Sequence, residues 1–307
     1  MWSASAKRLE RIKPHLNKRA RLIAALRSFF VTRGFLEIET PVRILSPAPE
    51  DHINAPSCGR HFLRSSPELH MKRLVAAGYE KIFQIGPCFR EGEIGRLHGE
   101  EFSMLEWYEA SSDYERLLMF VKEMLRQVVQ EVDGSTCATY GGVKIRFDAD
   151  WMVLSVDEAF RQFAGHGVEE AMERDEFEVV LVEKVEPSLP RDRPVILKDY
   201  PAAMAALARL KPDDHTVAER WELYLGGVEI ANAYSELTDP VEQKMRFDAV
   251  TERRRRAGLP AYPPDNEFLA ALSSGMPACA GCALGVDRLA MILCGACSIA
   301  EVRSFSE

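Results

Sequence analysis

The stretch FSMLEWY, residues 102–108, has the alternation of a strand at the centre of a protein. With a period of two, its even-numbered positions, Phe, Met, Glu106 and Tyr108, share one face, while Leu105 and Trp107 share the other. The face with Leu105 and Trp107 is apolar and indicates a core. The other sets a carboxylate and a phenol beside an aromatic ring. That face predicts either a half-exposed sheet surface with a stray glutamate or a cleft that stacks a flat ring and binds a cation.

The segments on either side of this strand predict the fold class. Extended segments are expected at 35–40, 81–90, 195–197, 219–237 with a turn at Gly226-Gly227, and 278–284. Helices are expected at 17–33, after Ser66-Pro67 up to Gly78, and at 113–132, 156–163 and 286–294. Helices and strands do not alternate regularly. This predicts an α+β fold, an antiparallel sheet flanked by helices, in one domain spanning 1–307 with an elaboration at about 134–215.

Composition limits the possible functions. The chain has 307 residues, 47% hydrophobic and 28% charged, which supports a sizeable core. Its net charge of −8 disfavours unaided capture of a nucleic acid. The sequence has no run long and apolar enough for a membrane span, and the basic N-terminus lacks the apolar segment of a secretory signal. Seven cysteines, an odd number, favour a reducing cytoplasm.

The segment CFREGEIGRLH, residues 88–98, takes Arg90 from the end of one strand into a loop that returns to the Phe102 strand. A guanidinium there suits phosphate oxygens. On its own the loop also fits a charged hairpin.

Three carboxylates, Glu222, Glu229 and Glu236, flank the Gly226-Gly227 turn. The latter two interrupt an apolar run and need partners if they are buried. Two carboxylates beside a phosphate site suit Mg²⁺, so Glu222 and Glu229 are predicted metal ligands. The alternative is a strand with solvated glutamates.

The segment GCALGVDRL, residues 281–289, is a glycine-rich strand that enters a helix, where Arg288 is placed to reach a phosphate. It matches neither a P-loop nor a dinucleotide fingerprint.

The pairs Cys279/Cys282 and Cys294/Cys297 have a spacing that zinc sites use. The first pair is expected to point its sulfurs to opposite faces of a strand, so we favour small core cysteines over a zinc site.

These segments in this order resemble a class II aminoacyl-tRNA synthetase catalytic domain. FLEIETP (35–41), together with the apolar stripe from Leu22 to Phe30 in the helix before it, is similar to motif 1, the dimer-forming segment. Residues 89–102 are similar to motif 2, and 281–288 to motif 3. The lysine-type subgroup is indicated by SPE (66–68), MLEWY (104–108) and EIANAYSEL (229–237). Lysyl-tRNA synthetases carry an anticodon-binding domain before motif 1, whereas here motif 1 begins near residue 20. The chain is therefore most similar to the elongation factor P–(R)-β-lysine ligase family.

The resemblance implies that a lysine-like amino acid, lysine or (R)-β-lysine, is activated with ATP and Mg²⁺ and transferred to a lysine of elongation factor P by a cytoplasmic homodimer. It implies catalytic roles for Arg90, Arg288 and His98. It implies ATP contacts for these three and for Glu91, Gly92, Glu93, Gly99, Phe102, Glu229, Ile230 and Gly285. It implies substrate contacts for Ser66, Pro67, Glu68, Glu106, Tyr108, Glu236 and Ala283.

Several alternatives stay open at this stage. The enzyme is expected not to use tRNA, but a stand-alone enzyme that charges tRNA and a catalytically silent regulatory paralogue are the competing hypotheses. Either Glu91 or Glu93 contacts adenine, because the family's usual glutamate position holds Gly92. Glu68 also fits a capping box with Ser65. The run Arg253–Arg256 fits a solvated helix face better than a docking site for an acidic partner.

Overall fold

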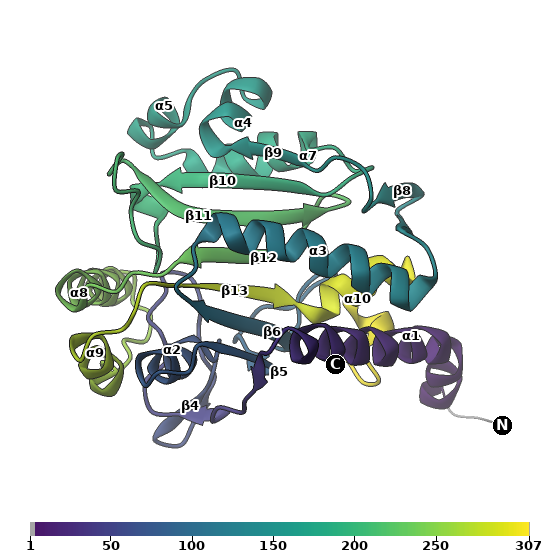
Figure 1. Cartoon of the computed structure of the whole chain (residues 1–307), viewed down its shortest axis with the longest axis horizontal. Coiled ribbons are helices and arrows are strands. Elements are labelled where there is room, and N and C mark those ends of the chain that lie inside the picture. The colour runs from purple at the N-terminus through teal and green to yellow at the C-terminus, as the bar shows by residue number, and fades with distance from the viewer. Residues whose placement is uncertain (1–3, 307) are drawn as a thin grey trace.

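The computed structural model describes residues 4–306. Its centre is an eight-stranded β-sheet (Figure 1). The strand order is β1-β5-β6-β13-β12-β11-β10-β9. Met1–Ser3 and Glu307 lie outside the described residues, and with them the start of the N-terminal stretch that we expect not to be a secretory signal.

The strands are β1 (Leu36–Glu37), β2 (Arg43–Ile44), β3 (Ser57–Cys58), β4 (His61–Leu63), β5 (Lys81–Phe89), β6 (Glu101–Ala110), β7 (Cys137–Tyr140), β8 (Val143–Arg146), β9 (Met152–Ser155), β10 (Val195–Pro201), β11 (Val217–Leu225), β12 (Val228–Ser235) and β13 (Cys279–Gly285). The α-helices are α1 (Ala4–Thr32), α2 (Glu68–Ala76), α3 (Tyr114–Asp133), α4 (Val156–Phe163), α5 (Val168–Glu173), α6 (Phe177–Val180), α7 (Glu186–Ser188), α8 (Pro240–Arg256), α9 (Asn266–Ser273) and α10 (Val286–Cys294). Short helical turns lie at η1 (Leu181–Val185), η2 (Ala202–Met204) and η3 (Ile299–Val302).

The predicted α+β fold is confirmed, with an antiparallel sheet centre and parallel edges. The strands from β5 to β10 in the sheet order pair antiparallel. At the edges, β1 pairs with β5 and β9 pairs with β10 in parallel. A parallel pair needs a crossover connection, and here α2 with the small β2-β4-β3 sheet supplies one and α4–α7 the other.

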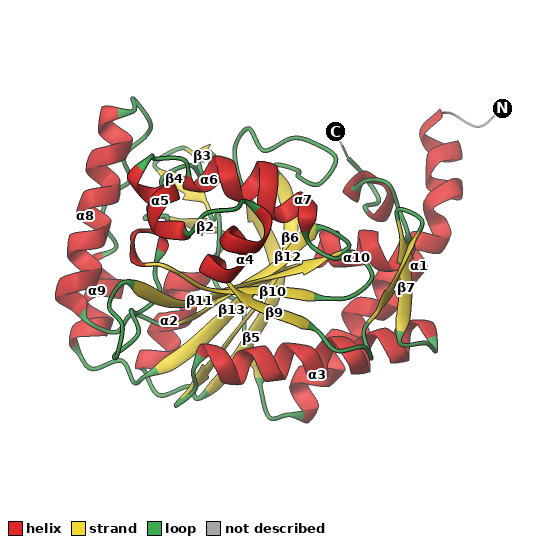
Figure 2. Ribbon diagram, turned by 90° about the horizontal axis from the view of Figure 1, so that it is seen from above, coloured by secondary structure: helices red, strands yellow, loops and turns green. Residues whose placement is uncertain are grey.

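Helices α1 and α3 cover one face of the large sheet, and the small sheet lies on the other side (Figure 2). Leu105 and Trp107 of β6 are fully buried in the apolar cluster that α1 and α3 share with the sheet. The opposite face of β6, with Phe102, Met104, Glu106 and Tyr108, lines a cavity.

Helix α1 corrects two expectations. The helix begins at Ala4, earlier than the expected residue 17, and it contains Pro14. Its first turns pack against the C-terminal segment, where Arg8 Nη1 donates to the carbonyl oxygen of Ser304 at 2.7 Å. Leu26 and Phe29 are fully buried within this chain, where the Phe29 and Phe120 rings lie 5.2 Å apart. The apolar stripe of α1 is thus part of the core and cannot be the dimer surface. The strand expected at 35–40 is only the two-residue β1.

The long helix expected at 113–132 forms as α3, with Asp113 accepting from the backbone N–H of Arg116 and Gly134 closing it at φ +63°. Helices α4 and α10 have the predicted bounds. Strand β9 and β10 of the predicted elaboration join the large sheet, and α4–α7 pack a separate apolar cluster against them. The elaboration is therefore continuous with the sheet.

The seven cysteines are free thiols. Cys279 and Cys282 lie on β13 but pack in different apolar clusters, as strand alternation requires. Among residues 4–306, no group of three or more His, Cys, Asp or Glu side chains is arranged to hold a metal ion. The absence of structural zinc at the cysteines stays a prediction.

Among residues 4–306, no helix combines the length and apolar character that a membrane span needs.

Candidate active site

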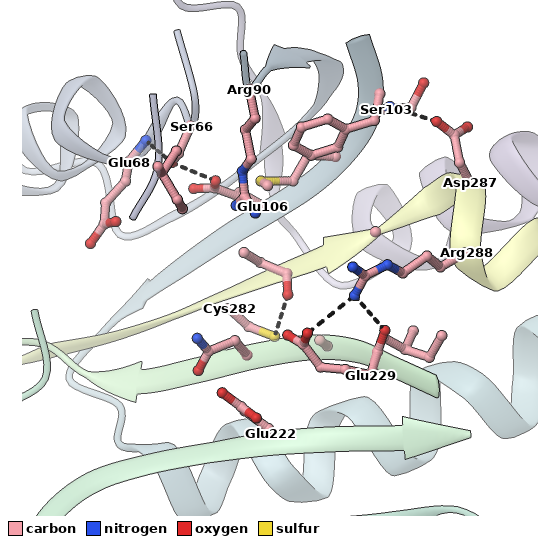
Figure 3. A pocket seen from close by; sticks show the side chains of 18 of the residues that line it. Ser66, Glu68, Arg90, Ser103, Glu106, Glu222, Glu229, Cys282, Asp287 and Arg288 are labelled. Carbon is pink, nitrogen blue, oxygen red and sulfur yellow. Dashed lines mark hydrogen bonds and ion pairs between the residues drawn. The ribbon is translucent and has the colours of Figure 1, made fainter. Parts of the chain in front are cut away.

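A cavity of about 410 Å³ opens on the polar face of β6 (Figure 3). It brings together most of the residues that the sequence singled out, although they come from segments far apart in the chain. Its lining includes Ser66, Glu68, Arg90, Glu93, His98, Gly99, Phe102, Glu106, Tyr108, Glu222, Glu229, Ile230, Glu236, Ala283, Gly285 and Arg288. The alternation of β6 thus predicts a cleft correctly, and its alternative, a half-exposed sheet face, is wrong.

Three predicted site residues, Pro67, Glu91 and Gly92, do not line the cavity. Gly92 turns the β5–β6 loop at φ +81°, and its N–H donates to Glu100 Oε1 at 2.7 Å. Glu91 is exposed. Glu93, beyond the turn, lies on the cavity with Oε1 3.7 Å from Arg90 Nη1. Pro67 is the N-cap residue of α2 and its side chain makes no capping hydrogen bond.

At one end of the cavity, hydroxyl groups hold Glu106. Ser66 Oγ donates to Glu106 Oε1 at 2.7 Å and Tyr108 OH donates to Oε2 at 3.1 Å. Ser66 Oγ in turn accepts from the backbone N–H of Glu68 at 2.9 Å, so the predicted capping box with Ser65 is wrong. Burial, together with the charge of Glu68, raises the pKa of Glu106 to about 8. The free protein therefore keeps Glu106 protonated to a higher pH than an ordinary glutamate.

Lys72 is a site residue that sequence reasoning missed. Its ammonium is fully buried, 2.5 Å from Glu68 Oε1 and 2.5 Å from Glu236 Oε2. Burial opposes the charge, but the two carboxylates outweigh it and raise the pKa of Lys72. Lys72 follows Glu68 by four residues on α2, a spacing that places two side chains together, and this was the available signal. Burial raises the pKa of Glu236 in spite of the nearby ammonium.

At the other end of the cavity lie the arginines. The Arg90 guanidinium is 5.1 Å from the centre of the Phe102 ring. Arg288 Nη1 donates to the Glu229 backbone oxygen at 2.9 Å and to Glu229 Oε2 at 3.1 Å. Its Nη2 lies 2.6 Å from His98 Nε2. Since a guanidinium only donates, Nε2 accepts, and burial together with Arg288 lowers the pKa of His98.

Glu222 and Glu229 both line the cavity, as the magnesium prediction requires. Burial raises the pKa of Glu229, and the negative charge of Glu222 adds to the increase. Glu222 accepts from Tyr200 at 2.6 Å and Tyr224 at 2.7 Å, and pairs with Arg220. A carboxylate offers about four acceptor positions, so each keeps a place for a cation. Each carboxylate also pairs with an arginine, Glu222 with Arg220 and Glu229 with Arg288. Two oxygen donors that line the same cavity fit Mg²⁺ that takes its other ligands from phosphates and water.

A buried network outside the predicted set joins the motifs. Asp287 Oδ1 pairs with Arg19 of α1 at 2.6 Å, and Asp287 Oδ2 accepts from the backbone N–H of Ser103 at 2.9 Å. These bonds tie α1, β6 and α10 together next to Arg288. Gly281 of β13 also lines the cavity, next to two of its side chains. A Cβ there would lie 2.2 Å from Tyr108 Cε1 and 2.5 Å from Glu236 Oε1, so glycine makes room for these side chains.

Known proteins are similar to this chain over nearly its whole length. Residues 4–307 match the family model of class II tRNA synthetases of the D, K and N type. A curated protein of Klebsiella pneumoniae named elongation factor P–(R)-β-lysine ligase is 39% identical over 316 residues, covering 95% of each chain. The chain belongs to the elongation factor P–(R)-β-lysine ligase family of class II synthetases.

Two further relatives carry the same name. The Proteus mirabilis protein is 38% identical over 308 residues and the Erwinia tasmaniensis protein 39% over 309 residues. Each alignment covers 95% of this chain and 94% of the relative. The predicted resemblance to this ligase family is therefore confirmed.

Proposed function

We propose that this protein activates (R)-β-lysine or lysine with ATP and transfers the acyl group to a lysine side chain of elongation factor P in the cytoplasm. The observation that carries the proposal is one cavity with carboxylates at one end and two arginines at the other. A lysine-like substrate has two ammonium groups and a carboxylate, so it can bind its cations at Glu68, Glu106 and Glu236 while its carboxylate reaches the phosphates. The names of the relatives contain (R)-β-lysine as the amino acid and elongation factor P as the acceptor.

In the first step, a carboxylate oxygen of the amino acid forms a bond to the α-phosphorus and the bond to the β-phosphate oxygen breaks, which releases pyrophosphate. Such a displacement needs alignment and charge neutralisation more than an acid or base. Arg90 binds the α-phosphate and Arg288 the γ-phosphate. Phe102 stacks on adenine, beside Ile230, Gly99, Gly285 and Glu93. Neutral His98 stays a hydrogen-bond partner next to the departing pyrophosphate.

Glu222 and Glu229 hold Mg²⁺, which offsets phosphate charge when it is bound. In the second step, an uncharged lysine amine of elongation factor P attacks the acyl carbonyl, AMP leaves, and the amine loses a proton. Exchange of labelled pyrophosphate into ATP tests the first step. We expect exchange that depends on the amino acid with lysine or (R)-β-lysine. The absence of exchange with both would contradict the proposal.

The pH dependence of substrate binding follows from Glu106. Its pKa of about 8 in the free protein means that a dicationic substrate, which favours the ionised carboxylate, displaces a proton when it binds at pH 7. Affinity for lysine should therefore rise from pH 6 to pH 8 by up to about tenfold per pH unit for each proton released. Calorimetry in buffers of different ionisation enthalpy should detect this proton release. Glu106→Gln should remove the part of the release that comes from Glu106. Buffer-independent heats would show that no proton leaves.

We propose a homodimer, but with a surface other than the stripe of α1. Large exposed apolar side chains remain on the same segment and on its neighbour: Val31 is 56% exposed, Leu36 51% and Met119 64%. They belong to α1, β1 and α3, and α1 packs on each of the other two. Light scattering at micromolar concentration should give about twice 34.6 kDa. Leu36→Asp should shift the mass toward the monomer, whereas a fully active monomer of the parent protein would refute the dimer.

A further inference from the structure

The segment between β2 and β3 carries Glu50 into the cavity and is firmly anchored. Arg254 Nη1 donates to the backbone oxygens of Glu50 at 2.6 Å and Ile53 at 2.9 Å, and Nη2 donates to Asn54 Oδ1 at 2.7 Å. Arg254 is 1% exposed, so this member of the arginine run is a buried anchor, neither a solvated nor a docking side chain. Arg253 adds a two-point contact to Asp51 at 2.7 and 2.8 Å.

Glu50 differs from the other carboxylates that line the cavity. Glu68 and Glu236 hold Lys72, Glu93 lies near Arg90, Glu106 accepts from two hydroxyls, and Glu222, Glu229 and Asp287 each pair with an arginine. Among these cavity carboxylates in residues 4–306, Glu50 is the one whose side chain has no hydrogen bond or ion pair. Burial raises the pKa of Glu50, the positive charge of Arg90 lowers it and the negative charge of Glu68 raises it, so Glu50 lies within electrostatic reach of both residues.

The three carboxylates that the sequence predicted for the substrate are Glu68, Glu106 and Glu236, and two of them are shared with a third cation, the ammonium of Lys72. A diammonium substrate brings two cations, but Lys72 already occupies one oxygen of Glu68 and one of Glu236. The substrate ammonium nearer to its reacting carboxylate must also lie close to Arg90, where that carboxylate meets the α-phosphate. A carboxylate without a partner, on an anchored segment and within electrostatic reach of both Arg90 and Glu68, is suited to this ammonium.

We propose that Glu50 accepts a charge-assisted hydrogen bond from the ammonium group on the carboxylate-bearing half of the substrate. This group is the α-ammonium of lysine or the β-ammonium of (R)-β-lysine. The proposal rests on the proposed function and adds a specificity-determining residue to it. Glu50 thereby selects a diamino acid over an amino acid that carries only the distant ammonium.

The compound 6-aminohexanoate tests this role, because it is both lysine without its α-amino group and β-lysine without its β-amino group. Pyrophosphate exchange is measured for all three compounds with the parent protein and with Glu50→Gln. We expect Glu50→Gln to raise the KM for the preferred diamino acid about ten- to hundredfold, the usual range for a lost charge-assisted hydrogen bond. The KM for ATP should change less than twofold. The preference for the diamino acid over 6-aminohexanoate should shrink by the same factor.

Glu252→Gln is the matched control, since this carboxylate lies on α8 beside the same arginine run but pairs only with Arg255 and Arg256. It should leave both KM values and the preference unchanged. A Glu50→Gln protein that keeps the preference would overturn the proposal. So would an equal rise in the KM of ATP, which would mean that Glu50 acts through Arg90. Failure of the proposed function looks different, because the parent protein would then exchange with none of the three compounds.

Discussion

Replacement of Arg90 with alanine should lower amino-acid-dependent pyrophosphate exchange by about a hundred- to a thousandfold. The guanidinium lies at the cavity beside Phe102, where negative charge grows on the α-phosphate during the displacement. Water that replaces the side chain supplies a weaker and less oriented field. The effect should appear mainly in kcat, because the interaction strengthens as the transition state forms.

Arg96→Ala is the control for this experiment. Arg96 belongs to the same β5–β6 loop but is exposed and donates to Tyr140 OH at 2.9 Å, away from the cavity. Its loss should change exchange less than a few-fold. Near-normal pyrophosphate exchange in a folded Arg90→Ala protein would contradict the proposal that Arg90 binds the α-phosphate.

Replacement of Lys72 with methionine should destabilise the protein by about 3–5 kcal/mol, which is the usual cost of leaving a buried charge without its partner. The change leaves Glu68 and Glu236 beside each other in a site where Lys72 is fully buried. One carboxyl should then take up a proton, which weakens binding of the amino acid. Urea denaturation and the KM for lysine measure the two effects.

Two further variants separate charge from packing. Adding Glu236→Gln to Lys72→Met removes one of the uncompensated carboxylates and should recover part of the stability without restoring substrate binding. Lys244→Met removes an exposed lysine that pairs with Asp248 four residues on, and should change stability by less than about 1 kcal/mol. A Lys72→Met protein as stable as the parent would show that the buried ion pairs contribute little.

Patterns local in sequence predicted their elements well. The alternation of β6 gave the correct faces because each side of this strand meets a different environment, a core on one side and the cavity on the other. Helix α10 ends where Gly295 adopts φ +63°, a stop that the sequence displays. The motifs around Arg90, Glu229 and Arg288 were also found from residue type and spacing.

Features that depend on distant partners were not predictable. The first turns of α1 are held by the C-terminal segment, and its apolar stripe meets α3 of the same chain instead of a second subunit. The run Arg253–Arg256 consists of four arginines, yet only Arg254 is buried. Its guanidinium donates to backbone oxygens of the segment around Glu50. The two glutamates that hold Lys72 come from α2 and from the end of β12, 168 positions apart in number.

Transfer of the activated amino acid tests the central claim most directly. Purified protein, ATP and Mg²⁺ are incubated with labelled (R)-β-lysine or lysine and offered either elongation factor P or bulk tRNA. The account predicts that label enters elongation factor P on a lysine side chain, that tRNA stays unlabelled, and that Arg90→Ala abolishes the transfer. Efficient charging of tRNA with no label on elongation factor P would contradict it and favour the stand-alone synthetase. Absence of both products with an intact protein would favour a catalytically silent paralogue.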